Sequence, residues 1–418
     1  MNRVYACIDL KSFYASVEAV ERGLDPFKVN LVVADSSRGK GAITLAITPA
    51  MKRLGVKNRC RLFQIPPEID YIIAKPRMSL YMKYSAFIYG IYLDYFCKNH
   101  IHIYSIDECF FDMTPYLELY KKKPVEILKE VIEEVYRRTG ICATGGLGSN
   151  LFLAKVAMDI ISKRVPDNIG VLDRASFYEH LSEYEPITDI WGIGCGIATT
   201  LAGIGITNLK GIREADCELM YKLFGVNAEL LIDHAKGIEP CTMEDIKRYT
   251  SSSHSVTTSQ ILFEDYDYRD AWTVLKEMID NLLLEIVPFD LKTNNISLSV
   301  GYSNDVHRRT GGSRKLSSYT NSYKVLETAF ETLYNDTVSC DYPIKKLGIS
   351  FNNVKSMDNL QLHLFDEFKD DRDENRVQKT VAEIKLRFGK NSILRCNSLK
   401  KKATGIARNK LIGGHNGW

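Results

Sequence analysis

Three acidic residues in two short stretches of the chain are the candidates for catalytic chemistry. Asp107 and Glu108 are adjacent carboxylates that follow an alternating apolar run over residues 101–106, and Asp9 ends a second apolar run. Because a strand alternates its side chains between faces, carboxylates at strand ends can converge at one edge of a sheet. Such oxygen ligands suit Mg²⁺, and two Mg²⁺ ions about 3.5–4 Å apart would contact the attacking and leaving oxygens of a phosphoryl transfer. The alternative is a solvated hairpin turn without chemistry.

The composition is that of a globular protein with several domains. The chain has 418 residues, of which 45% are hydrophobic and 26% charged, so two to four domains are expected. The net charge of +3 permits nucleic acid as a partner without requiring it. The ten cysteines contain no Cys-x-x-Cys pair, which argues against a zinc site or disulfide framework. With neither a signal peptide nor an apolar run of roughly 20 residues, we expect a cytoplasmic protein without a membrane partner.

Apolar spacing predicts the elements that position the carboxylates. A strand over residues 4–8 leads into a helix from about Ser12, and the carboxylate hairpin follows a long helix over residues 81–96. A glycine-rich stretch over residues 141–150 then runs into a helix over residues 151–158. The other expected elements are short strands and a helix over 31–65 and an amphipathic helix over 125–135.

The pattern changes to short helices with glycine turns from residue 181 to about residue 237. Its most specific piece is Gly192-Ile193-Gly194, whose bare backbone amides could approach a phosphate. The alternative is an ordinary glycine connector between packed helices.

The segment from about residue 251 to residue 354 is predicted to be a βαββαβ unit. Such a unit forms a four-stranded sheet with both helices on one face and the other face open. The interleaved Ser, Thr, Asn and Tyr residues favour a platform for a nucleic-acid backbone, whereas the alternative is a solvated surface. The basic residues near the open face are Arg308, Arg309, Arg314, Lys315, Lys345 and Lys346.

The remaining residues, 355–418, are more polar. A short apolar peptide over residues 361–365 precedes one amphipathic helix that carries Val377, Val381 and Ile384. The basic end of the chain, from Lys400 onward, is expected to be mobile.

Residues 9–18 and 105–108, in this order, resemble the two dense acidic motifs of the Y-family DNA polymerases, with the bacterial UmuC-type branch as the nearest match. The resemblance runs over nearly the whole chain. It implies an α+β right-hand polymerase with a ferredoxin-like palm, small fingers, a helical thumb with a helix-hairpin-helix, and a βαββαβ little finger. The implied boundaries are 1–17 and 77–168 for the palm, 18–76 for the fingers, 169–240 for the thumb, 241–355 for the little finger, and 356–418 for a tail with a clamp-binding peptide.

The resemblance assigns the metal ligands. Asp9, Asp107 and Glu108 would hold two Mg²⁺ ions, with the backbone carbonyl of Leu10 as a further ligand. Lys11 stands where some relatives carry an acidic residue, so no fourth carboxylate is expected.

The resemblance also assigns a nucleotide site. Tyr14 falls on the steric gate, an aromatic ring that would clash with a ribose 2′-OH, and Phe13 would pack against the nucleotide. Without the resemblance, both would be interpreted as helix core. Lys155 and Lys52 match the lysines that contact the triphosphate, with Arg53 as the alternative to Lys52.

Outside the active site, the resemblance assigns DNA and clamp contacts. Gly192 and Gly194 would hold DNA in the thumb. Leucine and phenylalanine anchors in residues 361–365 would enter an apolar pocket of the sliding clamp, although a buried strand is the alternative. The residues of this clamp-binding peptide are Gln361, Leu362, Leu364 and Phe365.

The implied function is error-prone, template-directed DNA synthesis past lesions. A nucleotide would pass from a dNTP to the 3′-OH of a primer on template DNA, without proofreading. The alternatives are a non-catalytic adaptor, disfavoured by the intact carboxylates, and a nucleotidyl cyclase, disfavoured by the DNA-binding segments. The sequence leaves open the lesion spectrum and whether an accessory subunit or a recombinase filament is required.

Overall fold

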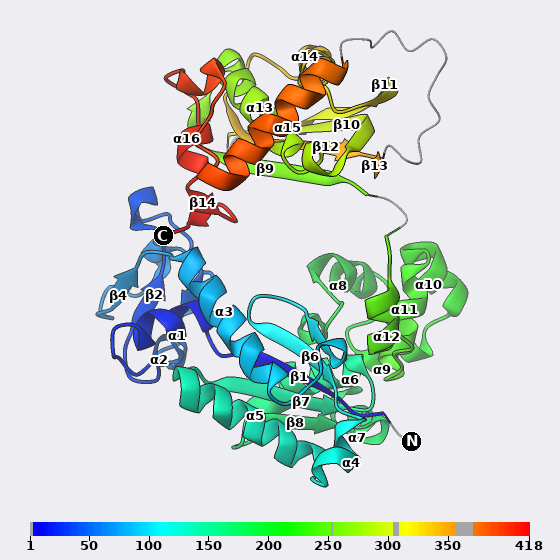
Figure 1. Ribbon diagram of the computed structural model, residues 1–418. Helices are drawn as coiled ribbons and strands as arrows, with labels where there is room; N and C mark the ends of the chain where they lie inside the picture. The colour runs from blue at the N-terminus through cyan, green and yellow to red at the C-terminus, as the bar shows by residue number, and fades with distance from the viewer. Residues whose placement is uncertain (1–2, 252–253, 304–308, 357–370) are drawn as a thin grey trace. The chain divides into compact units, whose positions relative to one another are not determined.

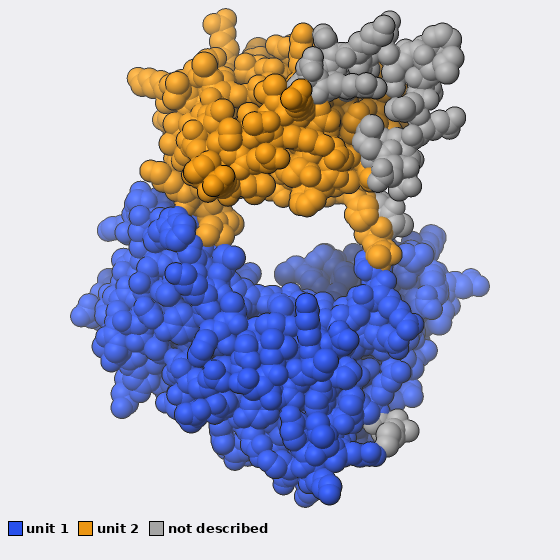
Figure 2. All heavy atoms as spheres, in the orientation of Figure 1, with its two compact units in different colours: residues 1–249, 415–418 blue, residues 250–414 orange. Residues whose placement is uncertain are grey.

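The computed structural model describes residues 3–251, 254–303, 309–356 and 371–418 (Figure 1). The chain divides into two compact units (Figure 2). Unit 1 comprises Met1–Tyr249 and His415–Trp418, and unit 2 comprises Thr250–Gly414. The finer division into palm, fingers, thumb and little finger stays a prediction.

Unit 1 is built on a five-stranded sheet with the order β5-β6-β1-β7-β8. The central strand β1 is antiparallel to both β6 and β7, while β8 runs parallel to β7. The predicted first strand is therefore confirmed, and it continues to Leu10. The bounds are β1 (Tyr5–Leu10), β5 (Ile101–Ile103), β6 (Glu108–Asp112), β7 (Ala143–Gly148) and β8 (Ile169–Leu172).

Glycines in β7 let helix α6 (Leu151–Val156) lie directly on the sheet. A Cβ atom added at Gly146 would lie 2.2 Å from the Ala154 carbonyl oxygen, and one at Gly148 would lie 2.3 Å from the Ala154 nitrogen. Asn150 caps the helix, since its Oδ1 accepts from Leu153 N at 2.8 Å. The chain continues as a π-helical turn, Ala157–Ile161. Glycine is required here because any side chain would push the helix off the strand.

Helix α5 (Pro124–Thr139) covers the opposite face of this sheet, because a Cβ atom at Gly145 would meet Leu128 of that helix at 2.8 Å. The predicted amphipathic helix is confirmed. The long helix α3 (Met78–Leu93), predicted over residues 81–96, begins and ends three residues earlier than expected.

A second, three-stranded sheet of unit 1 has the order β3-β2-β4. The short strands and the helix expected over residues 31–65 are present, although one strand, β3, has only two residues. The bounds are α1 (Phe13–Val20), β2 (Leu31–Val33), β3 (Ala46–Ile47), α2 (Pro49–Arg53) and β4 (Ile72–Ala74).

Short helices complete unit 1, and those between residues 174 and 235 share one apolar core with α6. Left-handed glycines, Gly192 (φ 91°) and Gly205 (φ 81°), stand between them, which confirms the predicted pattern. The bounds are α7 (Arg174–Leu181), α8 (Cys195–Ala202), α9 (Leu209–Glu214), α10 (Cys217–Phe224), α11 (Asn227–Ala235) and α12 (Met243–Arg248).

Unit 2 contains the predicted βαββαβ unit. Its four long strands form an antiparallel sheet with the order β11-β10-β12-β9, and both helices pack into one core with the apolar side chains of the strands. The bounds are β9 (Val256–Tyr266), α13 (Tyr268–Leu283), β10 (Leu291–Tyr302), β11 (Arg309–Thr320), α14 (Tyr323–Thr337) and β12 (Ile344–Asn352).

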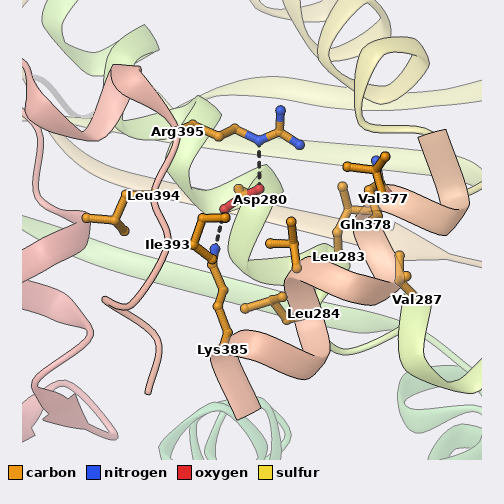
Figure 3. Close-up of a pocket in the computed structure, with 11 residues that line it drawn as sticks. Asp280, Leu283, Leu284, Val287, Val377, Gln378, Lys385, Ile393, Leu394 and Arg395 are labelled. Carbon is orange, nitrogen blue, oxygen red and sulfur yellow. Dashed lines mark hydrogen bonds and ion pairs between the residues drawn. The ribbon is translucent and has the colours of Figure 1, made fainter. Parts of the chain in front are cut away.

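The C-terminal segment belongs to unit 2 as far as Gly414, and His415–Trp418 belong to unit 1. Its backbone is held by hydrogen bonds beyond Lys400, so the prediction of a mobile end was wrong. The predicted amphipathic helix is α15 (Asp371–Phe388), which lines a small pocket together with α13 (Figure 3). Beyond it, buried Glu277 of α13 accepts hydrogen bonds from the backbone nitrogens of Thr404 at 2.8 Å and Gly405 at 2.9 Å. The sequence could not reveal these hydrogen bonds, because their acceptor, Glu277, lies 127 residues away from Thr404.

Two further properties bear on the predicted compartment. The ten cysteine thiols are all free. Within the described part of the chain, no helix is both long enough and apolar enough to cross a membrane.

Candidate active site

The three predicted catalytic carboxylates gather where β1 ends and β6 begins. Asp9 is the cross-strand partner of Glu108 in the antiparallel pair. The Leu10 nitrogen donates to the Asp107 carbonyl oxygen at 3.0 Å, which fixes the hairpin beside β1. Glu108 is buried, whereas Asp9 and Asp107 are half-buried. The convergence expected from strand periodicity is therefore observed.

The neighbouring carboxylates raise the proton affinity of Asp9. Burial and the negative charges of Asp107 and Glu108 raise the pKa of Asp9 to about 7. Burial also raises the pKa of Glu108, although Lys155 opposes that shift. The site thus holds more negative charge than its surroundings neutralise.

Lys155 is the cation within this group. Its Nζ lies 2.9 Å from Glu108 Oε1 and 3.0 Å from Asp159 Oδ2, and its side chain is 9% exposed. Burial alone would lower the pKa of Lys155, but the carboxylates of Asp159 and Glu108 raise it above its ordinary value. Sequence reasoning assigned Lys155 to the triphosphate; here its ammonium group contacts carboxylates instead, and the triphosphate role stays a prediction.

Sequence reasoning missed two partners of the carboxylates. The Cys7 thiol donates to Glu108 Oε1 at 3.2 Å, and the Ser105 hydroxyl donates to Asp107 Oδ1 at 2.6 Å. Cys7 precedes Asp9 by two residues and therefore shares its face of β1. The two-residue spacing from Asp9 could therefore have predicted that Cys7 lies beside the carboxylates.

The residues fit a hard divalent cation in their chemistry. They supply carboxylate oxygens with surplus negative charge, which a bound Mg²⁺ would offset. Yet no group of three His, Cys, Asp or Glu side chains within the described ranges is already arranged to hold a metal ion. Glu108 is turned toward Lys155 and Asp107 toward Ser105, so both would reorient on binding.

The two predicted aromatic residues begin helix α1. Ser12 adopts a left-handed conformation (φ 51°) and precedes Phe13, which is buried. The ring of Tyr14 stacks on Tyr81 with 4.5 Å between ring centroids. Burial, and secondly the charge of Asp107, raise the pKa of Tyr14. Tyr14 therefore lies near Asp107, and its role as a steric gate stays a prediction.

The structure favours Lys52 over Arg53 as the basic residue that faces the site. The Arg53 guanidinium donates to the Phe27 carbonyl oxygen. Desolvation lowers the pKa of Lys52, the carboxylate of Asp9 opposes this shift, and Lys163 adds to it. Lys163, which sequence reasoning left without a role, thus lies near Lys52.

The glycine turn before α8 is held to the main sheet through Trp191. The Trp191 indole donates to the Tyr104 hydroxyl at 3.1 Å. A Cβ atom at Gly194 would meet no other atom within 4 Å, so the backbone there is open to a ligand. The predicted contact of Gly192 and Gly194 with DNA is not tested by this geometry.

The uncovered face of the unit 2 sheet is polar. Ser297 and Ser299 point there, because they alternate with the buried Ile296 and Leu298 of β10. By register, Arg309, Lys315 and Lys346 share that face. Each is exposed.

Arg314, predicted to be on the open face, lies on the helix side instead. It pairs with the core residue Ile296, and its guanidinium contacts Asp336 of α14 at 2.6 Å. The remaining predicted contacts lie outside the described residues, namely Arg308, Gln361, Leu362, Leu364 and Phe365.

Comparison with known proteins identifies the family. The impB/mucB/samB family matches residues 8–159, and the C-terminal domain of the same family matches residues 253–364. A Bacillus subtilis (strain 168) protein named for UV-damage repair, UvrX, is 30% identical over 423 residues, covering 98% of this chain and 96% of its own length. The chain belongs to the impB/mucB/samB family, that of the Y-family DNA polymerases.

Further relatives agree with this family. DNA polymerase IV 2 of Bacillus subtilis (strain 168) is 28% identical, and the alignment covers 99% of each chain. A solved Y-family DNA polymerase chimera of Dbh and Dpo4 matches with a TM-score of 0.67 at 22% identity, over 84% of this chain and 99% of its own. The predicted family, the α+β polymerase fold and the class of DNA-directed DNA polymerase are confirmed. A bacterial UmuC- or DinB-type branch is consistent with these relatives.

Proposed function

We propose that this Y-family polymerase copies damaged template DNA by moving nucleotides from dNTPs to a primer 3′-OH, without proofreading, in the cytoplasm. The observation that carries the proposal is the pairing of Asp9 with Glu108 beside Asp107, in a site with surplus negative charge. A phosphoryl transfer needs positioned charge more than reactive side chains, and this site offers positioned charge.

Asp9, Asp107 and Glu108 would hold two Mg²⁺ ions, with the Leu10 carbonyl as a further ligand. When bound, these ions supply Lewis-acid stabilisation of the attacking and leaving oxygens. Before the ions bind, Lys155 pairs with Glu108, since a buried carboxylate without a partner would be costly.

The nucleotide would lie beside α1 and α2. Tyr14 would exclude the ribose 2′-OH, with Phe13 packed beside it at 5.7 Å between ring centroids. Lys52, with Lys163 near it, would be the basic group that faces the triphosphate; the influence of Asp9 on its pKa supports this assignment. Lys155 would have to leave Glu108 to reach the same phosphates.

DNA and the clamp would be bound by other parts of the chain. The open polar face of unit 2 and the turn at Gly192 and Gly194 offer backbone contacts to primer-template DNA. Residues 361–365 would dock on the sliding clamp. Replacing Leu364 and Phe365 with Ala should abolish stimulation by the clamp and leave basal extension unchanged; retained stimulation would place the docking peptide elsewhere.

Primer extension on a primed template with dNTPs and Mg²⁺ tests the central proposal. The Asp107→Ala/Glu108→Ala variant should lose extension by more than about 1,000-fold, because several transition-state interactions disappear together. Asp112→Ala, a carboxylate at the other end of β6, is the matched control and should retain activity. Equal extension by the double variant and the wild type would contradict the assignment. Inactivity of the wild type even with clamp, accessory subunit and recombinase filament would favour the adaptor.

A further inference from the structure

A second aromatic ring supports the proposed gate residue from behind. Tyr14 of α1 and Tyr81 of α3 stack with ring planes 18° apart. Tyr81 is fully buried, whereas Tyr14 is half-buried and so retains one accessible side. The position of the Tyr14 ring therefore depends on how firmly Tyr81 is fixed.

Tyr81 is fixed by a buried carboxylate. Its hydroxyl donates to Glu18 Oε1 at 2.8 Å, and the Glu18 side chain is 0% exposed. Arg77 donates to the same carboxylate from Nε at 3.0 Å and from Nη2 at 2.8 Å, and Arg22 contacts it as well. Burial alone would raise the pKa of Glu18, but the hydrogen bonds from these partners lower it, so the carboxylate is charged.

The arrangement follows from the spacing on two helices. Tyr14 and Glu18 are four residues apart on α1, and Arg77 and Tyr81 are four residues apart at the start of α3, so each pair shares one helix face. The two faces meet, with ring against ring and carboxylate against guanidinium. The geometry thus links a buried ion pair directly to the ring beneath the nucleotide.

A core needs no such charge to be stable. Burying a carboxylate with its partners is often no more stabilising than apolar side chains of the same volume. What the ion pair adds is orientation, because an arginine that donates two hydrogen bonds fixes the plane of the carboxylate. That plane in turn fixes the direction of the Tyr81 hydroxyl and ring.

We propose that Glu18 and Tyr81 are positioning residues for sugar selection: Glu18 orients Tyr81, and the Tyr81 ring keeps Tyr14 from yielding to a ribose 2′-OH. A steric gate discriminates only as far as it resists displacement, and a shift of about 1 Å at a reacting site can cost 100-fold. The inference rests on the proposed function, in particular on Tyr14 as the gate.

The test is the ratio of kcat/KM for a dNTP to kcat/KM for the rNTP with the same base. This ratio is independent of the fraction of folded enzyme, so partial loss of stability does not imitate the effect. Tyr81→Leu, which removes the ring, should lower the ratio by about 10- to 100-fold. Tyr81→Phe, which keeps the ring but loses the hydroxyl, and Glu18→Gln should lower it less, by several-fold.

Tyr84→Phe is the matched control. Tyr84 lies on the same helix, and its hydroxyl donates to the exposed Glu21 at 2.7 Å, away from Tyr14. The Tyr84→Phe variant should leave the ratio of the two kcat/KM values unchanged, and its KM for the dNTP should equal that of the wild type. An equal fall in the ratio for Tyr84→Phe would mean that any change in α3 disturbs the site, and it would overturn the inference.

The Tyr14→Ala variant distinguishes the proposed gate role of Tyr14 from the proposed positioning role of Tyr81 and Glu18. If it leaves the ratio unchanged, Tyr14 is not the gate and the proposed function loses that assignment. If Tyr14→Ala lowers the ratio while Tyr81→Leu and Tyr81→Phe do not, the gate stands and the positioning role of Tyr81 and Glu18 is wrong.

Discussion

Both units bury carboxylates beside a lysine, but the balance of charge is opposite in the two. In unit 1, Lys155 contacts Glu108 while Asp9 and Asp107 add further negative charge nearby. In unit 2, a single carboxylate, Asp280, is contacted by two cations (Figure 3). The unit 1 site has more carboxylates than cations in contact with them, whereas the carboxylate of unit 2 has two cationic partners.

The unit 2 site fastens the C-terminal segment to α13. Lys385 of α15 and Arg395 each lie 2.8 Å from an oxygen of Asp280. Burial alone would raise the pKa of Asp280, but these two cations lower it. Arg395 also lies over the Tyr323 ring at 3.6 Å. In unit 2, two cations on one carboxylate join elements that are remote in sequence, whereas the carboxylates of unit 1 outnumber the lysine beside them.

Removing the lysine should have unequal effects in the two units. Lys155→Met leaves Glu108 buried without its cation and should lower the free energy of unfolding of unit 1 by about 3–5 kcal/mol. Lys385→Met leaves Arg395 on Asp280 and should cost unit 2 only about 1–2 kcal/mol. Hydrogen exchange of peptides from each unit measures both values in the full chain. Equal losses would contradict the difference in charge balance.

Removing one carboxylate charge should have effects of opposite sign. Asp280→Asn removes the negative charge that Lys385 and Arg395 share and should destabilise unit 2 by about 2–3 kcal/mol. Asp9→Asn relieves repulsion and should leave the stability of unit 1 unchanged or raise it by up to about 1 kcal/mol, while extension is lost. Denaturant unfolding, followed separately for each unit, measures whether the free energy of unfolding rises or falls in each variant. A loss of stability in Asp9→Asn would mean that its charge is already neutralised.

Mg²⁺ should stabilise one unit only. At ten times its dissociation constant, a ligand of the native state raises the free energy of unfolding by about 1.4 kcal/mol. We expect this gain in unit 1 of the wild type, a smaller gain in Asp9→Asn, and none in unit 2. Hydrogen exchange with and without MgCl₂ measures it. A similar gain in both units would indicate non-specific binding.

The smallest effects are expected on the open face of unit 2. Arg309→Ala and Lys346→Ala should each weaken DNA binding a few-fold regardless of sequence, and each should reduce the slope of log K against log [salt] by about 1. Arg314→Ala is the matched control, because its guanidinium contacts Asp336 on the helix side. Its salt slope should equal that of the wild type in a binding titration. An unchanged slope in the first two variants would remove this face from the DNA site.

Local patterns alone determined much of the protein. Alternation and helical spacing predicted the strand that contains Asp9 and the βαββαβ unit. The alternating run over residues 101–106 is a strand only as far as Ile103, and Glu108 begins the next strand instead of following the run. The features that were predicted depend on residues within a few positions of one another. The dense acidic motifs identified the family for the same reason, because a hairpin that presents two carboxylates is encoded in consecutive residues.

Tertiary structure decided what each charged side chain meets. It turned Lys155 toward Glu108, placed Arg314 against a helix, and joined Tyr81 to Glu18 across 63 residues of sequence. The sequence lists the charges, but their balance is a sum over neighbours in space, most of them remote along the chain. Whether a carboxylate lies among other carboxylates or between two cations therefore follows only from the folded arrangement.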